Sequence, residues 1–390
     1  MLNVLKAGHS AQLSGTDRPQ MRKILVVIGT RPEAIKMAPL IHQLRAEPKL
    51  KTIVCLTAQH RQMLDQVLSI FNIDADIDLN LMKQGQRLCE LTGQVLHGID
   101  NAIELHKPHY VLVHGDTTTA MAAGMAAFYR HVPVGHVEAG LRTHDLQHPW
   151  PEEMNRRVID LMATQYYAPT EISRDNLLNE GISSDRIHIT GNTVIDALLM
   201  MVDRIRHDTK LTQQMAETFP FLDPGKRLIL VTGHRRENHG GRLANVCRAL
   251  KQLADRPDVQ VVYPVHPNPN VRKIIDEVFG VRPNITLIEP VDYLHFVYLM
   301  QASHLILTDS GGIQEEAPSL GKPVLVLRDV TERPEAVASG TIKLVGTDTD
   351  RVIEECKRLL VDETYYQSFA HRKNPYGDGL ASRRIVKTLL

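Results

Sequence analysis

The sequence has little of several features that would assign it to a specialised class of protein. It has only 4 cysteines in 390 residues, none at the paired spacing of a disulfide framework. No apolar run is long enough to span a bilayer, and the first 20 residues lack the apolar core of a signal peptide. The 45 basic and 45 acidic residues give a net charge of +0. This balance argues against nucleic acid or an anionic membrane as the main partner, and we expect a cytoplasmic protein.

Two cofactor motifs and the usual metal motifs are also absent. The first strand-to-helix turn reads GTRPEAIK, with one glycine and a proline, whereas a dinucleotide site needs G-x-G-x-x-G. A P-loop, an H-E-x-x-H pair and paired-cysteine spacing are missing as well. The best remaining metal candidates are His144, Asp145 and His148 in one predicted loop. We therefore expect neither a cofactor nor a metal ion.

Short β-branched runs alternate with longer amphipathic segments, which is typical of parallel sheets with crossover helices. The clearest strands are expected at 23–29, 52–58, 110–115, 132–139 and 165–170, and then at 227–233, 259–266, 285–290, 304–310 and 323–329. A chain of this length favours two domains, with a hinge expected near 188–200. We predict an α/β protein of two Rossmann-like domains, and we interpret residues 1–20 as a dispensable extension before Met21.

Polar residues follow nearly every predicted strand. The segments are GTRPE, AQHRQ, HGDTTT and EAGLRTHD in the first half, and GHRREN, VHPNPN, DSGG and RDVTERPE in the second. Ligands of open α/β sheets bind beyond the carboxyl ends of the strands. Because the pattern recurs in both halves, we expect one central cleft that the parallel sheets of both domains face.

The segment LTDSGGIQEEAP, residues 307–318, favours a phosphate group followed by a hydroxylated sugar. Its Ser-Gly-Gly turn opens a helix, where free backbone amides and the helix dipole attract an anion. The alternative is that the glycines only form a tight turn and Ser310 caps the helix. Glu316 could accept both hydroxyls of a ribose, and we interpret Glu315 as a solvated acid in the first turn. Arg333, in the next strand-end loop, could hold phosphate oxygens through its forked guanidinium.

Three acids of the first half are candidates for proton transfer. Asp116 and Glu138 end strands, and Glu152 opens a helix in HPWPEEMNRRVID. Acids that converge on one cleft raise each other's pKa and can act as acid, base and cation stabiliser. The alternatives are that Asp116 caps the helix after it and that Glu152 pairs with Arg156 four residues later on a solvated helix face.

Three further residues carry basic groups close to predicted strand ends. Arg31 follows a Gly-Thr turn and should face the cleft, whereas Lys36 could also be an ordinary surface lysine. His234 begins a run of three cations in GHRREN. At a strand end beside the expected diphosphate, it is a candidate acid or anion-binding group.

Together these motifs resemble those of the non-hydrolysing UDP-N-acetylglucosamine 2-epimerases. The resemblance is carried, in order from Met21 to the C-terminus, by GTRPEAIKMAPLI, HGDTTTAMAAG, HVEAGLRT, PEEMNRR, TGHRREN, HPNPNVR, TDSGGIQEEAPSLGKPVLVLRDVTERPEAV and NPYGDG. It implies a glycosyltransferase-B-like fold, a homodimer and a UDP-sugar in the cleft. It also implies that the chain end returns to the first domain. The domains would then be 21–190 plus 376–390, and a UDP-binding domain at 191–375.

The resemblance also implies roles for individual residues. The catalytic group would be Asp116, Glu138, Glu152 and His234. The substrate-binding residues would be Arg31, Lys36, Arg156, Phe296, Ser310, Gly311, Gly312, Glu316 and Arg333. A candidate activator site would comprise Gln59, Gln62, Arg235 and His266. The sequence departs from the family pattern at Val291, near the expected uracil, where a polar residue can occur.

The implied reaction is reversible epimerisation at C2 by elimination of UDP and its re-addition through 2-acetamidoglucal, supplying surface polysaccharide synthesis. Three alternatives stay open at this point. A hydrolysing 2-epimerase would release N-acetylmannosamine and UDP. A glycosyltransferase of the same fold would need an acceptor and leave C2 untouched. A nucleotide-binding regulator would have no turnover, and three converging acids argue against it.

Overall fold

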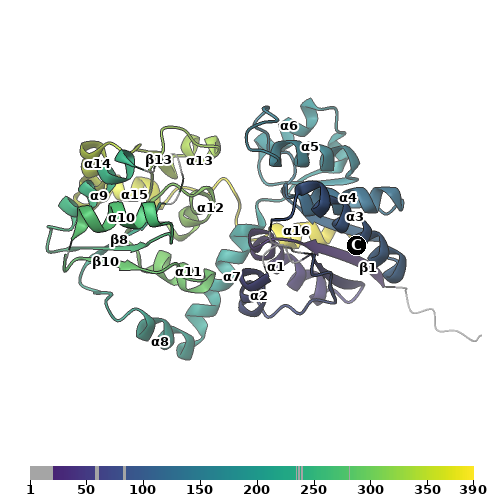
Figure 1. The fold of residues 1–390 in the computed structure, drawn as a ribbon, viewed down its shortest axis with the longest axis horizontal. Coiled ribbons are helices and arrows are strands. Elements are labelled where there is room, and N and C mark those ends of the chain that lie inside the picture. Colours follow the sequence, from purple (N-terminus) through teal and green to yellow (C-terminus); the bar gives the residue numbers. More distant parts are fainter. Residues whose placement is uncertain are drawn as a thin grey trace, which may run out of the picture.

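The structure is a computed structural model, and it describes residues 21–57, 61–81, 85–233, 235, 238, 240–280 and 282–390, without the side chains of 61–63. The predicted extension 1–20 lies outside these residues. Two α/β halves lie on either side of a long helix, α7 (Thr193–His207), which runs between them in Figure 1. We refer to the halves as the N-terminal and C-terminal domains.

The N-terminal domain is built on a sheet of seven parallel strands in the order β3-β2-β1-β4-β5-β6-β7. Its strands are β1 (Arg22–Ile28), β2 (Leu50–Leu56), β3 (Ile77–Asp78), β4 (Tyr110–His114), β5 (Val134–Val137), β6 (Gln165–Ala168) and β7 (Ile187–Ile189). The intervening helices are α1 (Arg31–Ala46), α2 (Arg61–Ile70), α3 (Leu88–His106), α4 (Thr118–Tyr129), α5 (Glu152–Met162), α6 (Glu171–Asn179) and the 3-10 turn η1 (Ser184–Arg186).

The C-terminal domain repeats the architecture with six parallel strands in the order β10-β9-β8-β11-β12-β13. The strands are β8 (Arg227–Thr232), β9 (Val259–Pro264), β10 (Ile285–Ile288), β11 (Leu305–Thr308), β12 (Val324–Val326) and β13 (Ile342–Leu344). The helices are α8 (Thr209–Thr218), α9 (Gly241–Leu253), α10 (Pro269–Phe279), α11 (Tyr293–Ala302), α12 (Gly311–Glu316), η3 (Ala317–Leu320), α13 (Pro334–Ala338), α14 (Thr349–Val361) and α15 (Glu363–Ala370).

Helices cover both faces of each sheet, which explains why the strands read as continuous apolar runs. In β1, Val26 and Ile28 belong to one core cluster, and Leu25 and Val27 belong to the cluster on the other face. All of these side chains are buried. Three of the four cysteines are buried as well, and only Cys89 is exposed.

The chain end lies beside the N-terminal domain. The last helix, α16 (Ala381–Thr388), packs against α1 and α7. Arg22 donates to the carbonyl of Leu389 at 3.0 Å, and the hydroxyls of Tyr167 and Thr388 lie 2.9 Å apart. These contacts support our proposal that 376–390 belongs to the first domain, with the boundary between the domains near 190.

The predicted fold class is confirmed. All ten predicted strands exist, with ends within three residues of the predicted ones. The sequence analysis missed three strands of two or three residues, β3, β7 and β13. In the part of the chain that the structure describes, no helix is long and apolar enough to cross a bilayer.

Candidate active site

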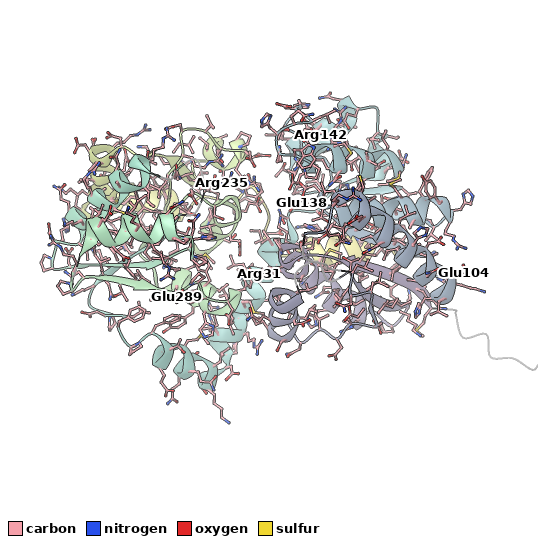
Figure 2. The ribbon with its side chains drawn as sticks, viewed as in Figure 1. Arg31, Glu104, Glu138, Arg142, Arg235 and Glu289 are labelled. Carbon is pink, nitrogen blue, oxygen red and sulfur yellow. The ribbon has the colours of Figure 1, made fainter. Side chains whose placement is uncertain are left out.

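Both sheets have a point where the strand order reverses, and the two points face each other across the interdomain cleft. In the N-terminal sheet it lies between β1 and β4, and in the C-terminal sheet between β8 and β11. Loops that follow such strands form the ligand crevice of open α/β sheets. Here they carry Arg31, Asp116 and Ser310. Figure 2 labels Arg31 and Glu138 in one domain and Arg235 in the other.

The first cavity of the cleft, which we call the acid cavity, has a volume of about 350 Å³. Its walls come from the N-terminal domain and from the loop before α13. They include six residues predicted to act on or bind substrate: Lys36, Asp116, Glu138, Glu152, Arg156 and Arg333. The sequence therefore identified a set of side chains that the fold brings together from five separate segments and two domains.

The second cavity, which we call the serine–glycine cavity, has a volume of about 260 Å³. It is lined mainly by the C-terminal domain, and Arg31 reaches it from the N-terminal domain. Among the predicted residues it contains Arg31, His266, Phe296, Ser310, Gly312 and Glu316. Val291 and Tyr293 complete the wall beside Phe296.

A largely buried ion pair, with side-chain exposures of 15% for Lys36 and 10% for Glu138, joins α1 to the end of β5 inside the acid cavity. The Nζ of Lys36 donates to Oε2 of Glu138, which also accepts from Nδ2 of Asn192 at 2.7 Å. Burial alone would raise the pKa of Glu138, but the charge of Lys36 and the other interactions of the carboxylate, including the hydrogen bonds from Lys36 and Asn192, together outweigh it and the pKa is lowered. Lys36 is not a surface lysine, and the prediction that the three acids raise each other's pKa is wrong for Glu138.

Asp116 is held by helix α5. Its side chain accepts a hydrogen bond from Arg156, and its backbone carbonyl accepts from Nδ2 of Asn155 at 2.9 Å. Thr117, not Asp116, caps α4, because its side chain accepts from the amide of Ala120 at 3.0 Å. The carboxylate of Asp116 is therefore used in the cavity and not as a helix cap.

The alternative pairing of Glu152 with Arg156 is wrong. Arg156 contacts Asp116 and, at 3.3 Å, Glu153, because the guanidinium turns toward the loop after β4. Glu152 begins α5 directly after Pro151 and lines the acid cavity. Its Oε2 is buried and has no hydrogen-bond partner among the described residues.

His114 is an acid-cavity residue that the sequence analysis missed. It ends β4 beside Asp116, and its Nε2 lies 3.7 Å from Oε2 of Glu138. Burial lowers the pKa of His114 to about 3, so its imidazole is neutral. Its place at a strand end, two residues before Asp116 in VHGD, could have identified His114 as a candidate from the sequence.

Of the two glutamates after the Ser-Gly-Gly turn, Glu315 differs from the sequence interpretation. Glu315 is buried and accepts a hydrogen bond from Nε of Arg333 at 2.9 Å, and Nη2 of Arg333 lies 2.8 Å from the same oxygen. It is therefore not a solvated acid. Glu316 lines the serine–glycine cavity, where burial raises its pKa to about 7 and the hydroxyl of Tyr293 donates to it at 2.7 Å.

The Ser-Gly-Gly turn has the geometry that a ligand needs to approach the backbone closely. Ser310 stands at the N-cap of α12, but its side chain makes no capping hydrogen bond. A Cβ added to Gly311 would lie 3.0 Å from the guanidinium carbon of Arg333, so a larger residue would force the guanidinium to shift away from the turn. The alternative in which Ser310 serves only as a helix cap is therefore not supported.

Comparisons with known proteins agree with this geometry. Residues 42–390 match the family model described as UDP-N-acetylglucosamine 2-epimerase. A UDP-N-acetylglucosamine 2-epimerase of Escherichia coli K12 is 56% identical over 368 residues, covering 94% of this chain and 98% of that protein.

The chain belongs to the UDP-N-acetylglucosamine 2-epimerase family.

Solved structures of this family share its fold. The Neisseria meningitidis epimerase, described as bound to UDP-GlcNAc, has a TM-score of 0.86 at 54% identity, covering 94% of this chain and 99% of that one. The Methanocaldococcus jannaschii epimerase, in complex with UDP-GlcNAc and UDP, has a TM-score of 0.75 at 34% identity, with coverage of 94% and 99%. The glycosyltransferase-B-like architecture and the resemblance of the sequence to this epimerase family are thereby confirmed, and the chain is an isomerase of nucleotide sugars.

Some predicted residues lie elsewhere. His234 and Gln59, and the side chain of Gln62, fall outside the described part of the chain. Arg235 lines neither the acid cavity nor the serine–glycine cavity; its amide donates to Asp309 at 3.0 Å, and its guanidinium lies 3.8 Å from Glu332. Because Gln59 and the side chain of Gln62 lie outside the described residues, the activator site stays a prediction.

Two further features of the fold bear on ligands. Nδ1 of His148 donates a hydrogen bond to Oδ2 of Asp145 at 2.9 Å on an exposed loop. Across the described ranges, no cluster of three or more histidine, cysteine or acidic side chains is arranged to hold a metal ion.

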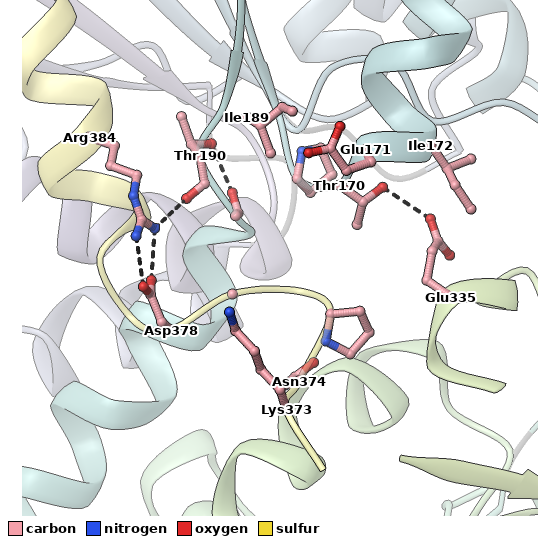
Figure 3. A pocket seen from close by; sticks show the side chains of 14 residues that line it. Thr170, Glu171, Ile172, Ile189, Thr190, Glu335, Lys373, Asn374, Asp378 and Arg384 are labelled. Atoms are coloured by element: carbon pink, nitrogen blue, oxygen red, sulfur yellow. Dashed lines mark hydrogen bonds and ion pairs between the residues drawn. The ribbon is translucent and has the colours of Figure 1, made fainter. Parts of the chain in front are cut away.

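Figure 3 shows another cavity, of about 550 Å³, where segment 373–378 passes α6 and α13. It contains none of the predicted site residues.

Proposed function

We propose that this chain interconverts UDP-N-acetylglucosamine and UDP-N-acetylmannosamine without hydrolysis, by eliminating UDP and adding it back to 2-acetamidoglucal. The observation that carries the proposal is the pairing of two cavities in one cleft. One is lined by carboxylates, and the other has a glycine turn, an aromatic ring and a buried carboxylate. A nucleotide sugar has two chemically different ends that match these two cavities.

The serine–glycine cavity suits UDP. Backbone amides of Gly311 and Gly312 and the dipole of α12 would hold the diphosphate, and Glu316 would accept from the ribose hydroxyls. Phe296 would lie against the uracil, with Val291 beside it. That relatives at 54% and 34% identity are described as bound to UDP-GlcNAc supports the same ligand class here.

The acid cavity suits the sugar and the chemistry at C1 and C2. A C2 proton beside an acetamide is barely acidic, so its direct removal would be slow. If the C1–O bond breaks first, UDP leaves with the bonding electron pair and an oxocarbenium-like centre forms. Loss of the C2 proton to a carboxylate then gives neutral 2-acetamidoglucal. Delivery of a proton to the opposite face, with return of UDP to C1, gives the manno epimer.

The side chains of the acid cavity divide naturally between these tasks. Glu138 is kept ionised by Lys36, so it suits stabilisation of the oxocarbenium charge or acceptance of a proton. Asp116 and Glu152 are the other two proton-transfer candidates, and Arg156 holds Asp116 in place. We assign His234 to the same catalytic group on the motif alone.

Cations at the junction of the two cavities would stabilise the departing diphosphate. Arg31 lines the serine–glycine cavity, and Arg333 and Lys36 line the acid cavity. The guanidinium of Arg333 packs over Gly311 at the start of α12, close to the expected diphosphate. The negative charge that develops on the leaving group can therefore be met by side chains of this chain.

The proposal also covers the location, oligomeric state, pathway and activation of the enzyme. A cytoplasmic homodimer that supplies surface polysaccharide synthesis is what the family resemblance implies. We propose that Gln59, Gln62, Arg235 and His266 contribute to an activator site. His266 would connect this site to the bound nucleotide, because His266 lines the serine–glycine cavity.

Product analysis tests the proposal. The purified chain is incubated with UDP-N-acetylglucosamine and followed by proton and phosphorus NMR. We expect a mixture of the two UDP-sugars that is the same from either starting epimer. Stoichiometric free N-acetylmannosamine with UDP would identify a hydrolysing enzyme instead. Sugar transfer only when an acceptor is added, with C2 unchanged, would identify a glycosyltransferase.

A further inference from the structure

Tyr293, at the start of α11, contacts the carboxylate that we assign to the ribose. Its hydroxyl donates to Oε2 of Glu316 at 2.7 Å, and both side chains are buried. A carboxylate can accept several hydrogen bonds, and this one fixes the orientation of the group at the wall of the serine–glycine cavity. Tyr293 lines the same wall, directly beside Glu316.

The ring of Tyr293 stacks on a residue of the other domain. Its centroid lies 6.0 Å from that of Phe71, at an interplanar angle of 29°. Phe71 follows α2 and is buried. Figure 1 draws α2, α7 and α11 next to one another at the junction of the two halves.

Phe71 is itself fixed to the N-terminal domain. Nε2 of His42, on α1, donates to its carbonyl at 2.7 Å, and its amide donates to the carbonyl of Val67 at 3.0 Å. The preceding carbonyl, of Ile70, accepts from Arg204 on α7. The position of the Phe71 ring therefore follows the N-terminal domain and the hinge helix.

We propose that Tyr293 is a positioning residue for Glu316, and that the Phe71–Tyr293 stack makes the geometry of the nucleotide carboxylate depend on the N-terminal domain. This inference rests on the proposed function, because it assumes that Glu316 binds the ribose. The inference goes beyond the proposed function because it assigns a role to two aromatic side chains that the mechanism does not use.

The charges around Glu316 determine the pH at which its carboxyl group loses its proton. Glu315, on the same helix, disfavours its ionised form, and Lys36 of α1 favours it. Arg31 from the first domain and His266 from the second line the same cavity. Because the pKa of Glu316 is about 7, mainly through burial, affinity for UDP should rise as the pH increases through this value. Removal of the Tyr293 hydroxyl removes a donor that lowers this pKa, so the rise should move to higher pH.

The first experiment compares Tyr293→Phe with the wild-type chain. We expect the Kd for UDP and the KM for the UDP-sugar to rise about tenfold at pH 7, with kcat within about twofold, because a hydrogen bond to a charged group is lost. The effect should be largest near pH 7, where less of Glu316 is ionised in the variant, and should level off toward pH 9 at the cost of losing the orienting hydrogen bond alone. The matched control is Tyr366→Phe, which removes a hydroxyl that donates to the carbonyl of His304 in the same domain.

The second experiment tests the link between the domains with a double-mutant cycle. Phe71→Leu keeps an apolar side chain but removes the ring, and it should raise KM severalfold in the wild-type background. In the Tyr293→Phe background the same change should have little further effect, because both act through the orientation of Glu316. Circular dichroism and melting temperature check that each variant is folded, and Phe71→Leu keeps the test open if Tyr293→Phe does not fold.

The outcomes separate this inference from the proposed function. If wild-type protein binds UDP and epimerises the substrate, but Tyr293→Phe changes neither Kd nor its pH dependence, the positioning role is overturned. A Phe71→Leu effect that is absent, or is equal in both backgrounds, overturns the interdomain link. If the wild-type chain itself neither binds UDP nor epimerises the sugar, the proposed function fails first.

Discussion

Lys36 and Glu138 form a buried ion pair between α1 and the end of β5, in the wall of the acid cavity. The pair explains how a carboxylate with little solvent exposure stays ionised where an oxocarbenium-like charge would form. The charge of Glu138 reciprocally raises the pKa of Lys36, although burial by itself would lower it. Each partner therefore needs the other to remain charged in this site.

The substitution Lys36→Met tests whether the charge of Glu138 depends on Lys36. Without the cation, burial of Glu138 loses its largest opposing interaction, although the hydrogen bond from Asn192 remains, so the pKa rises and the ionised fraction at pH 7 falls. We expect kcat to fall about 10²-fold or more at pH 7 and to recover in part as the pH is raised. Loss of one partner of a buried pair should also lower stability by about 3–5 kcal/mol.

A full pH–rate profile with thermal unfolding checks this prediction. Lys273→Met is the control, because Lys273 lies 3.9 Å from Glu277 in an exposed pair on α10. Such pairs contribute about 0–1 kcal/mol. A profile of unchanged shape for Lys36→Met would show that Lys36 does not set the charge of Glu138.

Asp116→Asn keeps the shape of the side chain but removes its charge and its basicity. Removing a proton-transfer group should lower kcat by about 10²–10⁴-fold. The Kd for UDP should barely change, because the serine–glycine cavity lies on the other domain. Rates by NMR and UDP binding by calorimetry test both parts, with exposed Asp145→Asn as the control. Near-normal turnover in Asp116→Asn would remove Asp116 from the catalytic group.

Glu33 should make stability depend on pH. It is buried at the start of α1, where it accepts from the amides of Gly29 and Thr30 and from the hydroxyl of Thr117. Burial raises its pKa from 4.5 to about 7. Below 4.5 the carboxyl is protonated in both states. Between 4.5 and 7 only the folded state keeps the proton, so its contribution to stability is lost as the pH rises.

Glu33→Gln should therefore gain stability relative to wild type across this pH range, by a difference on the order of 3 kcal/mol. Glutamine can retain the capping-box contact with Thr30. Melting temperatures at half-unit pH steps measure the difference. Glu90→Gln is the control, since Glu90 is an exposed glutamate at the same position of α3. A constant offset between Glu33→Gln and wild type would mean that Glu33 does not hold a proton.

Activity should survive exhaustive treatment with EDTA. The diphosphate charge can be met by Arg31, Arg333 and the amides at the start of α12, so the proposed chemistry needs no divalent ion. Turnover before and after chelation, with added Mg²⁺, Mn²⁺ or Zn²⁺, measures this. Loss of activity that one ion restores would contradict the prediction and direct attention to the loop of His144 and Asp145.

The sequence could predict the sheets and most of the site because both follow from local rules. Strands buried on both faces need continuous β-branched runs, which β1 and β8 have. Residues after parallel strands meet at one edge of the sheet, so Asp116 and Glu138 could be placed in one cleft. Strands as short as β3 have no period to detect, and they form only because a neighbouring strand is present.

The errors concern partners that lie far apart in the chain. The pKa of Glu138 depends on Lys36, 102 residues away, and Arg156 turns from its own helix to Asp116, 40 residues away. The sequence predicts that Glu315 is a solvated acid in the first turn of its helix, but it lies near the end of α12, where Arg333 and the fold around it bury the carboxylate. Long flexible side chains choose among several partners, and only the three-dimensional arrangement decides between them.

The measurement that tests the central claim most directly is isotopic. UDP-N-acetylglucosamine is turned over in heavy water, and C2 of the recovered UDP-sugars is examined by proton NMR and mass spectrometry. Elimination and re-addition require the C2 proton to leave to a side chain that exchanges with solvent. The account therefore predicts one deuterium at C2 of UDP-N-acetylmannosamine, with traces of UDP and 2-acetamidoglucal. Epimerised product that retains its original proton at C2 would contradict it.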